Sequence, residues 1–388
     1  MNWFLSSLLL FVSFIGMGQA PTPTNNGIVV ESNKVIVLDS FSVTPASIEE
    51  QAIIKSEFTS KKKEASLQKK EQFAAQVSFY NTQFSQTFQA VKTATTQRGP
   101  STVQLQKMEA ARDFFAQNLP TSFESYFYQY VLNPFDPNSF SLLKEAAKLK
   151  PTHEDLRNYL FSHFYLQEQW NNADSLVGEM VNDQSITPFQ LNYARDLLAS
   201  CGSSTLIVHG FSDFLPVYYV KQQTGNRTNL INLWLLQAEH YRKALNSQQY
   251  IPNQEIVNTT FFEHYIAENR SRPYNISLTV PKAYYEKYSS DFVVSGLTLQ
   301  FTNFIQNDLE IPINIAGINE QLFDSELKNI TDQALNNPLL MNYIPFLVTL
   351  KNRFGLTQQM DNYQKAQGHI LQIGTKTNAL EQLKPYLD

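Results

Sequence analysis

Residues 204–236 contain two short apolar segments on either side of a helical pattern, and this arrangement constrains the fold more than any other part of the chain. The apolar segments are Thr205–Val208 and 230–236, which are bounded by Gly, Asn and Thr. Between them, residues 213–223 have the spacing of a helix that ends at Gly225. A buried strand, a helix and a second buried strand in this order predict a β-α-β unit. We therefore expect a small α/β module in this region.

The first predicted strand is followed by small and polar residues. Ligands of α/β proteins bind at the carboxyl ends of strands, so these residues mark the place where a site is expected. The candidate ligand-binding residues, all within the predicted unit, are His209, Gly210, Ser212, Asp213, Tyr219 and Arg227.

Two interpretations of this segment stay open. Ser212 and Asp213 stand where the helix begins, so their side-chain oxygens are expected to cap its free backbone N–H groups. In the alternative interpretation, Asp213 contacts a ligand. His209 has the chemistry of an acid or base, but no Ser, Cys or second carboxylate stands at a diagnostic spacing from it.

Metal and nucleotide sites lack the usual sequence patterns. The six histidines form no H-x-x-x-H or H-x-H pair, and no G-x-G-x-x-G or P-loop motif is present. We therefore expect no metal and no cofactor, and no catalytic residue is assigned.

The region before the α/β unit is predicted to be helical. Apolar residues from Phe73 to Val91 form one stripe of a long helix, the Gly99–Pro100 pair ends it, and residues 101–118 form a second helix. This pattern predicts a long helical hairpin over residues 45–119.

Residues 120–200 are similar to tetratricopeptide repeats, whose period is about 34 residues. Ala146 and Ala173 occupy the small position at which two helices of one hairpin approach closely, and Leu160 is expected to face Ala173. Tyrosines cluster on these helices, and a groove between hairpins would suit their large contact area. The candidate partner-binding residues are Tyr126, Tyr130, Tyr159 and Tyr165.

Further strands are predicted at 276–280 and 297–301, which gives four strands in a module spanning residues 201–310, with a helix at 261–268. Residues 311–388 are predicted to hold C-terminal helices at 320–336, 338–354, 357–371 and 376–387. The fold class expected is therefore mainly α with a small α/β module.

Residues 1–20 resemble a signal peptide. An apolar run from Trp3 to Met17 precedes Gly18-Gln19-Ala20, a small-x-small site that predicts cleavage after Ala20. The alternative is an uncleaved N-terminal anchor. Position 20 is not the cysteine that lipidation requires, so we expect a periplasmic or secreted protein in which residues 21–44 form an extended arm.

The composition limits the class of partner. The net charge is −5 and the isoelectric point is near 5.8, which argues against a nucleic-acid partner. The basic cluster Lys61-Lys62-Lys63 with Lys69-Lys70 is interpreted as a solvated helix face. Peripheral association with a membrane is an alternative mode of binding. The single cysteine, Cys201, follows an apolar run and is expected to be a buried small hydrophobe.

A set of spaced motifs runs through residues 200–305: 209–216, Tyr218-Tyr219, Gly225, Arg227, 232–236, 272–277 and 295–299. With these motifs the segment resembles the soluble C-terminal region of a bacteroidete envelope family whose N-terminal half resembles membrane-embedded protein O-mannosyltransferases. The family loop after the first strand is Asn-Gly-Asp-Asn-Asp-Thr, of which this chain keeps Gly210 and Asp213, with Phe211 and Phe214 in place of polar residues. A metal or phosphate site on that loop would lose oxygen ligands, and glycosyl transfer is not expected.

These observations favour an exported, non-catalytic scaffold or adaptor protein of the cell envelope that binds an envelope protein or peptide through its helical repeats. The alternative is a carbohydrate-binding or degenerate enzyme module with its site at the end of the first strand.

Overall fold

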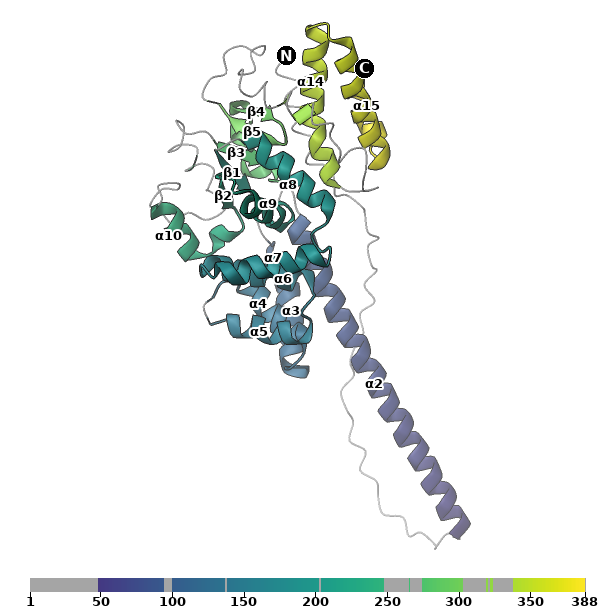
Figure 1. Ribbon diagram of the computed structural model, residues 1–388. Helices are drawn as coiled ribbons and strands as arrows, with labels where there is room; N and C mark the ends of the chain where they lie inside the picture. Colours follow the sequence, from purple (N-terminus) through teal and green to yellow (C-terminus); the bar gives the residue numbers. More distant parts are fainter. Residues whose placement is uncertain are drawn as a thin grey trace.

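The computed structural model describes residues 48–93, 100–136, 138–201, 204–247, 265, 274–302, 319, 322–323 and 338–387. These residues form a mainly helical protein with one small mixed sheet, as the sequence predicts (Figure 1). The signal-peptide and extended-arm predictions, and almost all of the helices expected at 261–268 and 320–336, lie outside the described residues.

The first two described helices form the predicted hairpin. They are α2 (Ile48–Thr93) and α3 (Thr102–Asn118), which pack against each other. Ser101 starts α3 with a capping box, because Gln104 N donates to Ser101 Oγ over 3.2 Å and Ser101 N donates to Gln104 Oε1 over 2.8 Å. Helix α2 is much longer than α3, and its first half projects away from the body of the protein (Figure 1).

Two shorter helix pairs follow. Helices α4 (Phe123–Leu132) and α5 (Phe140–Leu149) pack together, as do α6 (Glu154–Leu166) and α7 (Trp170–Asn182). Ala146 and Ala173 are fully buried, which agrees with their predicted place between paired helices. The expected contact of Leu160 with Ala173 is wrong, because Leu160 packs against one hydrophobic core and Ala173 belongs to the other, together with the neighbouring Phe161.

The α/β module begins after α8 (Pro188–Cys201), in which Cys201 is buried as expected. Strand β1 (Thr205–Val208), helix α9 (Phe211–Thr224) and strand β2 (Asn229–Asn232) form the predicted β-α-β unit, with β1 and β2 parallel. Gly225 ends α9 in the left-handed conformation, at φ 63°, which a glycine adopts without strain.

The described sheet has five strands rather than the four predicted, in the order β2-β1-β3-β5-β4. Strand β3 (Tyr274–Ser277) is parallel to β1, whereas β5 (Thr298–Phe301) is antiparallel to both β3 and β4 (Phe292–Ser295). The strand missed was β4, which pairs with β5 across a tight turn at Gly296. A Cβ atom at Gly296 would lie 2.2 Å from Ser200 Oγ, so the turn packs too closely on α8 for any other residue.

After β2 the chain forms the short helix η1 (Leu235–Gln237) and α10 (Glu239–Ser247). Two short helices, η2 (Lys282–Tyr284) and η3 (Glu286–Asp291), connect β3 to β4. The C-terminal part consists of η4 (Pro338–Tyr343), α14 (Ile344–Leu356), α15 (Met360–Lys376), α16 (Leu380–Leu383) and η5 (Lys384–Tyr386). Helices α14 and α15 pack as a further helical hairpin. They overlap the helices predicted at 338–354 and 357–371 but continue past these predicted ends, to Leu356 and Lys376.

The buried hydrophobic side chains of the described residues form two clusters. One lies among α2 to α6 and includes Phe84, Phe115 and Tyr128, whereas the other lies around the sheet and the C-terminal helices. Trp234, two residues after β2, packs against both clusters. Its ring centroid lies 5.2 Å from that of Tyr159 on the helical side and 4.9 Å from that of Phe211 on the sheet side. Trp234 therefore joins the α/β module to the helix pairs.

Candidate functional site

The candidate site lies where the strand order of the sheet reverses. From β1 the chain passes to β2 on one side, and the later strand β3 pairs with β1 on the other side. Residues that follow β1 and β3 therefore meet at the same carboxyl edge. In open α/β sheets this reversal is the place at which ligands bind.

Asp213 lies at the centre of this edge. It stands in the first turn of α9 and its side chain is completely buried. Thr279 Oγ1, from the segment after β3, donates a hydrogen bond to Asp213 Oδ2. Ser277 Oγ lies 2.9 Å from Thr279 Oγ1, so the contact continues into β3. Asp213 Oδ1 has no hydrogen-bond partner within the described part of the chain.

Burial controls the ionisation of Asp213. Loss of solvent raises the pKa of this carboxyl group, although the hydroxyl groups of Thr279 and Ser277 and the nearby amides of Asp213 and Phe214 act in the opposite direction. The neutral acid is therefore favoured more than at an exposed aspartate.

The predicted capping roles of Ser212 and Asp213 are wrong. Gly210 is the N-cap of α9, and no side chain forms a cap hydrogen bond there. The helix begins two residues earlier than the sequence pattern indicates, since α9 already includes Phe211 and Ser212. This shift places Asp213 inside the first turn, where its carboxyl group accepts a hydrogen bond from Thr279, in the segment after β3.

A second contact crosses the same edge. His209 Nε2 lies 3.3 Å from Tyr284 Oη, and the two rings meet edge to face with centroids 5.2 Å apart. Burial lowers the pKa of His209 to about 4, so the imidazole is neutral at pH 7. A neutral imidazole offers one donor and one acceptor nitrogen, and Tyr284 engages one of them.

Asn232, at the end of β2, fixes the loop between β1 and α9. Its Nδ2 donates to the Gly210 carbonyl over 3.5 Å, and its Oδ1 accepts from the Trp234 amide over 2.8 Å. The backbone N–H of Asn232 donates to Tyr241 Oη over 3.1 Å. The loop that carries His209 and Gly210 is therefore tied to the strand on its other side.

The other predicted ligand-binding residues do not gather around Asp213. Ser212 is exposed, a Cβ atom added at Gly210 would have no neighbour within 4 Å, and Tyr219 is half-buried against the larger core. Arg227 is exposed and follows the end of α9. A helix of this length separates its two ends by about 20 Å, so Arg227 cannot share a site with Gly210.

Sequence reasoning missed Ser277, Thr279 and Tyr284. Ser277 ends β3, whereas Thr279 and Tyr284 follow it. This strand was predicted, but the sequence pattern does not show that it pairs with β1. Parallel pairing of β1 and β3 is the missing information, because it places the residues that follow both strands, Thr279 and Asp213 among them, at the same edge of the sheet.

The candidate partner-binding tyrosines have different environments. Tyr130 and Tyr159 are only 2% and 5% exposed and pack edge to face, with centroids 5.2 Å apart. These two belong to the core, which corrects the expectation that they face a groove. Tyr126 and Tyr165 are half-buried, and Tyr165 packs against the exposed Trp170 with centroids 5.5 Å apart.

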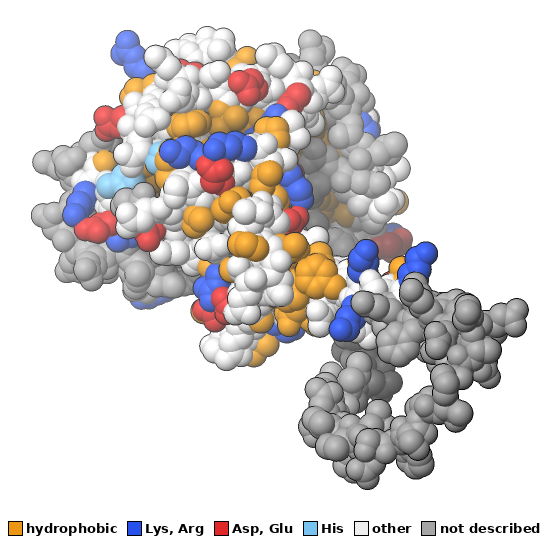
Figure 2. Space-filling model, turned by 90° about the horizontal axis from the view of Figure 1, so that it is seen from below, with side chains coloured by type: hydrophobic (Ala, Val, Ile, Leu, Met, Phe, Trp, Pro, Cys, Tyr) orange, Lys and Arg blue, Asp and Glu red, His pale blue; other side chains and the backbone are white. Residues whose placement is uncertain are grey.

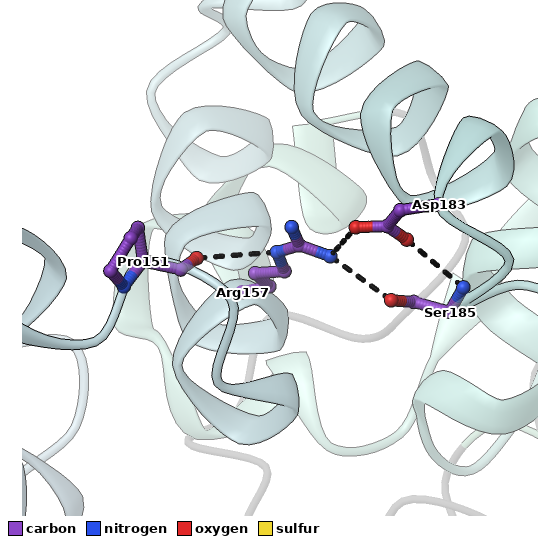
Figure 3. Close-up of polar contacts among 4 residues, drawn as sticks. All are labelled: Pro151, Arg157, Asp183 and Ser185. Atoms are coloured by element: carbon purple, nitrogen blue, oxygen red, sulfur yellow. Dashed lines mark hydrogen bonds and ion pairs between the residues drawn. The ribbon is translucent and has the colours of Figure 1, made fainter.

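A buried arginine holds the helix pairs together (Figure 3). Arg157 Nε donates to the Pro151 carbonyl over 3.2 Å, and its Nη1 donates to Asp183 Oδ2 over 2.5 Å and to Ser185 Oγ over 3.0 Å. The Asp183 pKa falls to about 2, first through the Ser185 hydroxyl and amide and then through Arg157. Arg157 thus connects the loop before α6 to the loop after α7.

Among the described residues, no group of three or more His, Cys, Asp or Glu side chains is arranged to hold a metal ion. In the same part of the chain, no helix combines the length and apolar character that a membrane span requires. Comparison of the chain with protein-family models, curated proteins and solved structures finds no match. The function is therefore inferred from the sequence and the geometry.

Proposed function

We propose that this chain is an exported, non-catalytic scaffold or adaptor protein of the bacterial cell envelope, which binds a protein partner through its helical hairpins. The observation that carries the proposal is the distribution of exposed apolar side chains. Every exposed large hydrophobic side chain in the described residues belongs to a helix outside the α/β module: Leu67, Phe73, Phe79, Val103, Leu105, Leu149, Trp170, Leu356, Met360 and Leu371.

The polar groups of the α/β module support the same proposal. Asp213 binds Thr279, and His209 contacts Tyr284, so both groups already engage neighbours in the fold. Exposed apolar surface favours association with another protein, because burying it releases water. Among the described residues, the helices therefore expose more large apolar side chains to a partner than the strand ends do.

Chemical crosslinking in envelope extract tests this proposal. The mature protein should capture a discrete partner protein, and intact-mass measurement should place its first residue at or near Pro21. A full-length cytoplasmic product, or the absence of any specific crosslinked partner, would overturn the proposal.

A second candidate function is carbohydrate binding at the carboxyl edge of β1. The observation that favours it is Asp213 Oδ1, a buried oxygen that accepts no hydrogen bond within the described chain. Sugar hydroxyl groups are donors of the required kind. A thermal-shift screen against monosaccharides tests it: a stabilisation that is lost in Asp213→Asn supports binding there, and no shift with any sugar removes this candidate.

A further inference from the structure

A row of aromatic rings crosses the surface of the α2–α3 hairpin near the end of α3. Phe114 of α3 lies between two residues of α2, with ring centroids 6.2 Å from Phe73 and 4.4 Å from Tyr80. Phe79 extends the row, with its centroid 5.2 Å from that of Tyr80. Phe73 is 38% exposed and Phe79 is 62% exposed. The seam between α2 and α3 therefore ends in an open aromatic surface.

Helix α2 continues beyond this surface without a described neighbour. Helix α3 ends at Asn118, whereas α2 continues from Phe73 towards Lys63 and then further towards its N-terminus. Residues 63, 64 and 66–72 are all exposed. No described residue therefore covers the line along which α3 packs on α2 in the part of α2 before Phe73.

The charges on this stretch are sorted by face. With about 100° between successive residues of an α-helix, Lys69 and Lys70 lie about 40° and 60° from Phe73, and Lys63 lies about 80° from it. By the same geometry Glu64 and Glu71 lie about 180° and 160° away. The uncovered continuation of the seam is therefore basic, and the acidic side chains point the other way. Figure 2 shows hydrophobic and basic side chains next to each other on the face seen from below.

We propose that the aromatic-basic surface of Lys63, Lys69, Lys70, Phe73 and Phe114 binds an acidic amphipathic helix of the partner protein. The inference rests on the proposed function and specifies its surface. The bound helix lies along α2 in line with α3, with apolar side chains against Phe73 and Phe114 and carboxylates against the three lysines. Charge complementarity selects an acidic segment and sets its position along α2.

The form of the surface favours a helix over a lipid bilayer. Phe114 and Tyr80 are half-buried in the seam, and Phe79 points about 120° away from Phe73 around α2. These rings do not share one plane that could enter a membrane interface, whereas a helix packing into a groove contacts side chains of this arrangement.

A synthetic peptide tests the proposal on the mature full-length protein. The probe is a fluorescent amphipathic helix with Leu on one face and Glu on the other, as long as the α2 stretch from Lys63 to Tyr80. Its counterpart carries Lys in place of Glu. Fluorescence anisotropy measures both against the native protein, the Lys69→Glu/Lys70→Glu variant and the Phe73→Ala variant. The matched control is Lys243→Glu/Lys384→Glu, which changes the same charge at exposed lysines elsewhere.

We expect the acidic peptide to bind the native protein and the control variant alike. Binding to Lys69→Glu/Lys70→Glu and to Phe73→Ala should be at least about tenfold weaker, while their melting temperatures stay unchanged because the substituted side chains are at least partly exposed. Equal binding of the Lys peptide, or equal loss in the control variant, would overturn the proposal. So would binding only to anionic phosphatidylglycerol vesicles, or concentration-dependent dimerisation that Phe73→Ala abolishes.

The crosslinking experiment separates this inference from the function on which it rests. If the native protein captures a partner and Lys69→Glu/Lys70→Glu captures it equally, the surface assignment is wrong and the scaffold function stands. If the native protein captures none, the scaffold function itself fails.

Discussion

Asp213 in the first turn of α9 accepts a hydrogen bond from Thr279, which lies 66 residues later and two residues beyond β3. The contact joins the segment after β1 to the segment after β3, so it spans the carboxyl edge of the sheet where the strand order reverses. It also buries a carboxyl group whose pKa is raised by loss of solvent. Both consequences can be measured.

Asp213→Asn should leave the protein at least as stable as the native form at pH 7, because the amide oxygen still accepts from Thr279 and no charge is buried. Asp213→Ala should cost about 1–2 kcal/mol, since Thr279 loses its acceptor. A raised folded-state pKa stabilises the native protein below the ordinary value of 3.8, and this contribution is lost as the pH rises through the folded-state pKa. Urea unfolding between pH 3 and 7 should therefore show that the free energy of unfolding of Asp213→Asn increases, relative to that of the native protein, as the pH rises. A constant difference would show that Asp213 is not desolvated.

His209 should give the opposite pH dependence. Its pKa falls from 6.5 to about 4 on folding, so its contribution is complete above pH 6.5 and is lost as the pH falls towards 4. On acidification from pH 6.5 to 4, the free energy of unfolding should fall by up to about 2–3 kcal/mol less in His209→Gln than in the native protein. His163, whose pKa also falls to about 4 through burial, is the matched comparison. If His209→Gln leaves the acid limb of the stability profile unchanged, the imidazole is not held neutral by the fold.

Trp234→Ala should destabilise the protein by about 2–4 kcal/mol, because Trp234 packs against both hydrophobic clusters. Loss of the bridge should also broaden or split the calorimetric transition as the two clusters unfold separately. Trp170→Ala is the control, since Trp170 is 46% exposed, and it should cost about 1 kcal/mol or less. Equal effects of the two substitutions would contradict the bridging role.

Ala173→Leu should cost roughly 1–3 kcal/mol, because Ala173 is fully buried and a larger side chain overpacks the core. Ala110→Leu, at an exposed position of α3, should be nearly neutral. Melting curves that do not distinguish Ala173→Leu from the native protein would show that α6 and α7 are not closely packed at this position.

Arg157→Lys should lower the melting temperature, although the charge is kept. A lysine ammonium group cannot reproduce the fork of donors that contacts the Pro151 carbonyl, Asp183 and Ser185 together. Lys148→Arg, at an exposed lysine of α5, is the control for an exchange of cationic side chains and should have no effect. An unchanged melting temperature of Arg157→Lys would show that the three contacts do not stabilise the packing of the helix pairs.

Local patterns in the sequence determined most of the elements. The β-α-β unit, the α2–α3 hairpin and the end of α9 at Gly225 follow from hydrophobic periodicity and backbone preference over a few residues, so they can be predicted without knowing the remainder of the fold. The start of α9 was misplaced because Gly210 caps the helix without a side chain. Strand β4 was missed because its four residues carry little periodic signal.

The candidate site, in contrast, was decided by the tertiary structure. Asp213 meets Thr279 because β3 pairs with β1, and Tyr130 and Tyr159 are buried because α4 packs near α6 and Trp234. Such contacts join residues far apart in the sequence, and the local pattern around each residue is the same whether or not its partner is present. The sequence by itself therefore determined which segments become helices and strands, whereas only the packing of those segments decided which polar groups are buried together and which aromatic rings remain exposed.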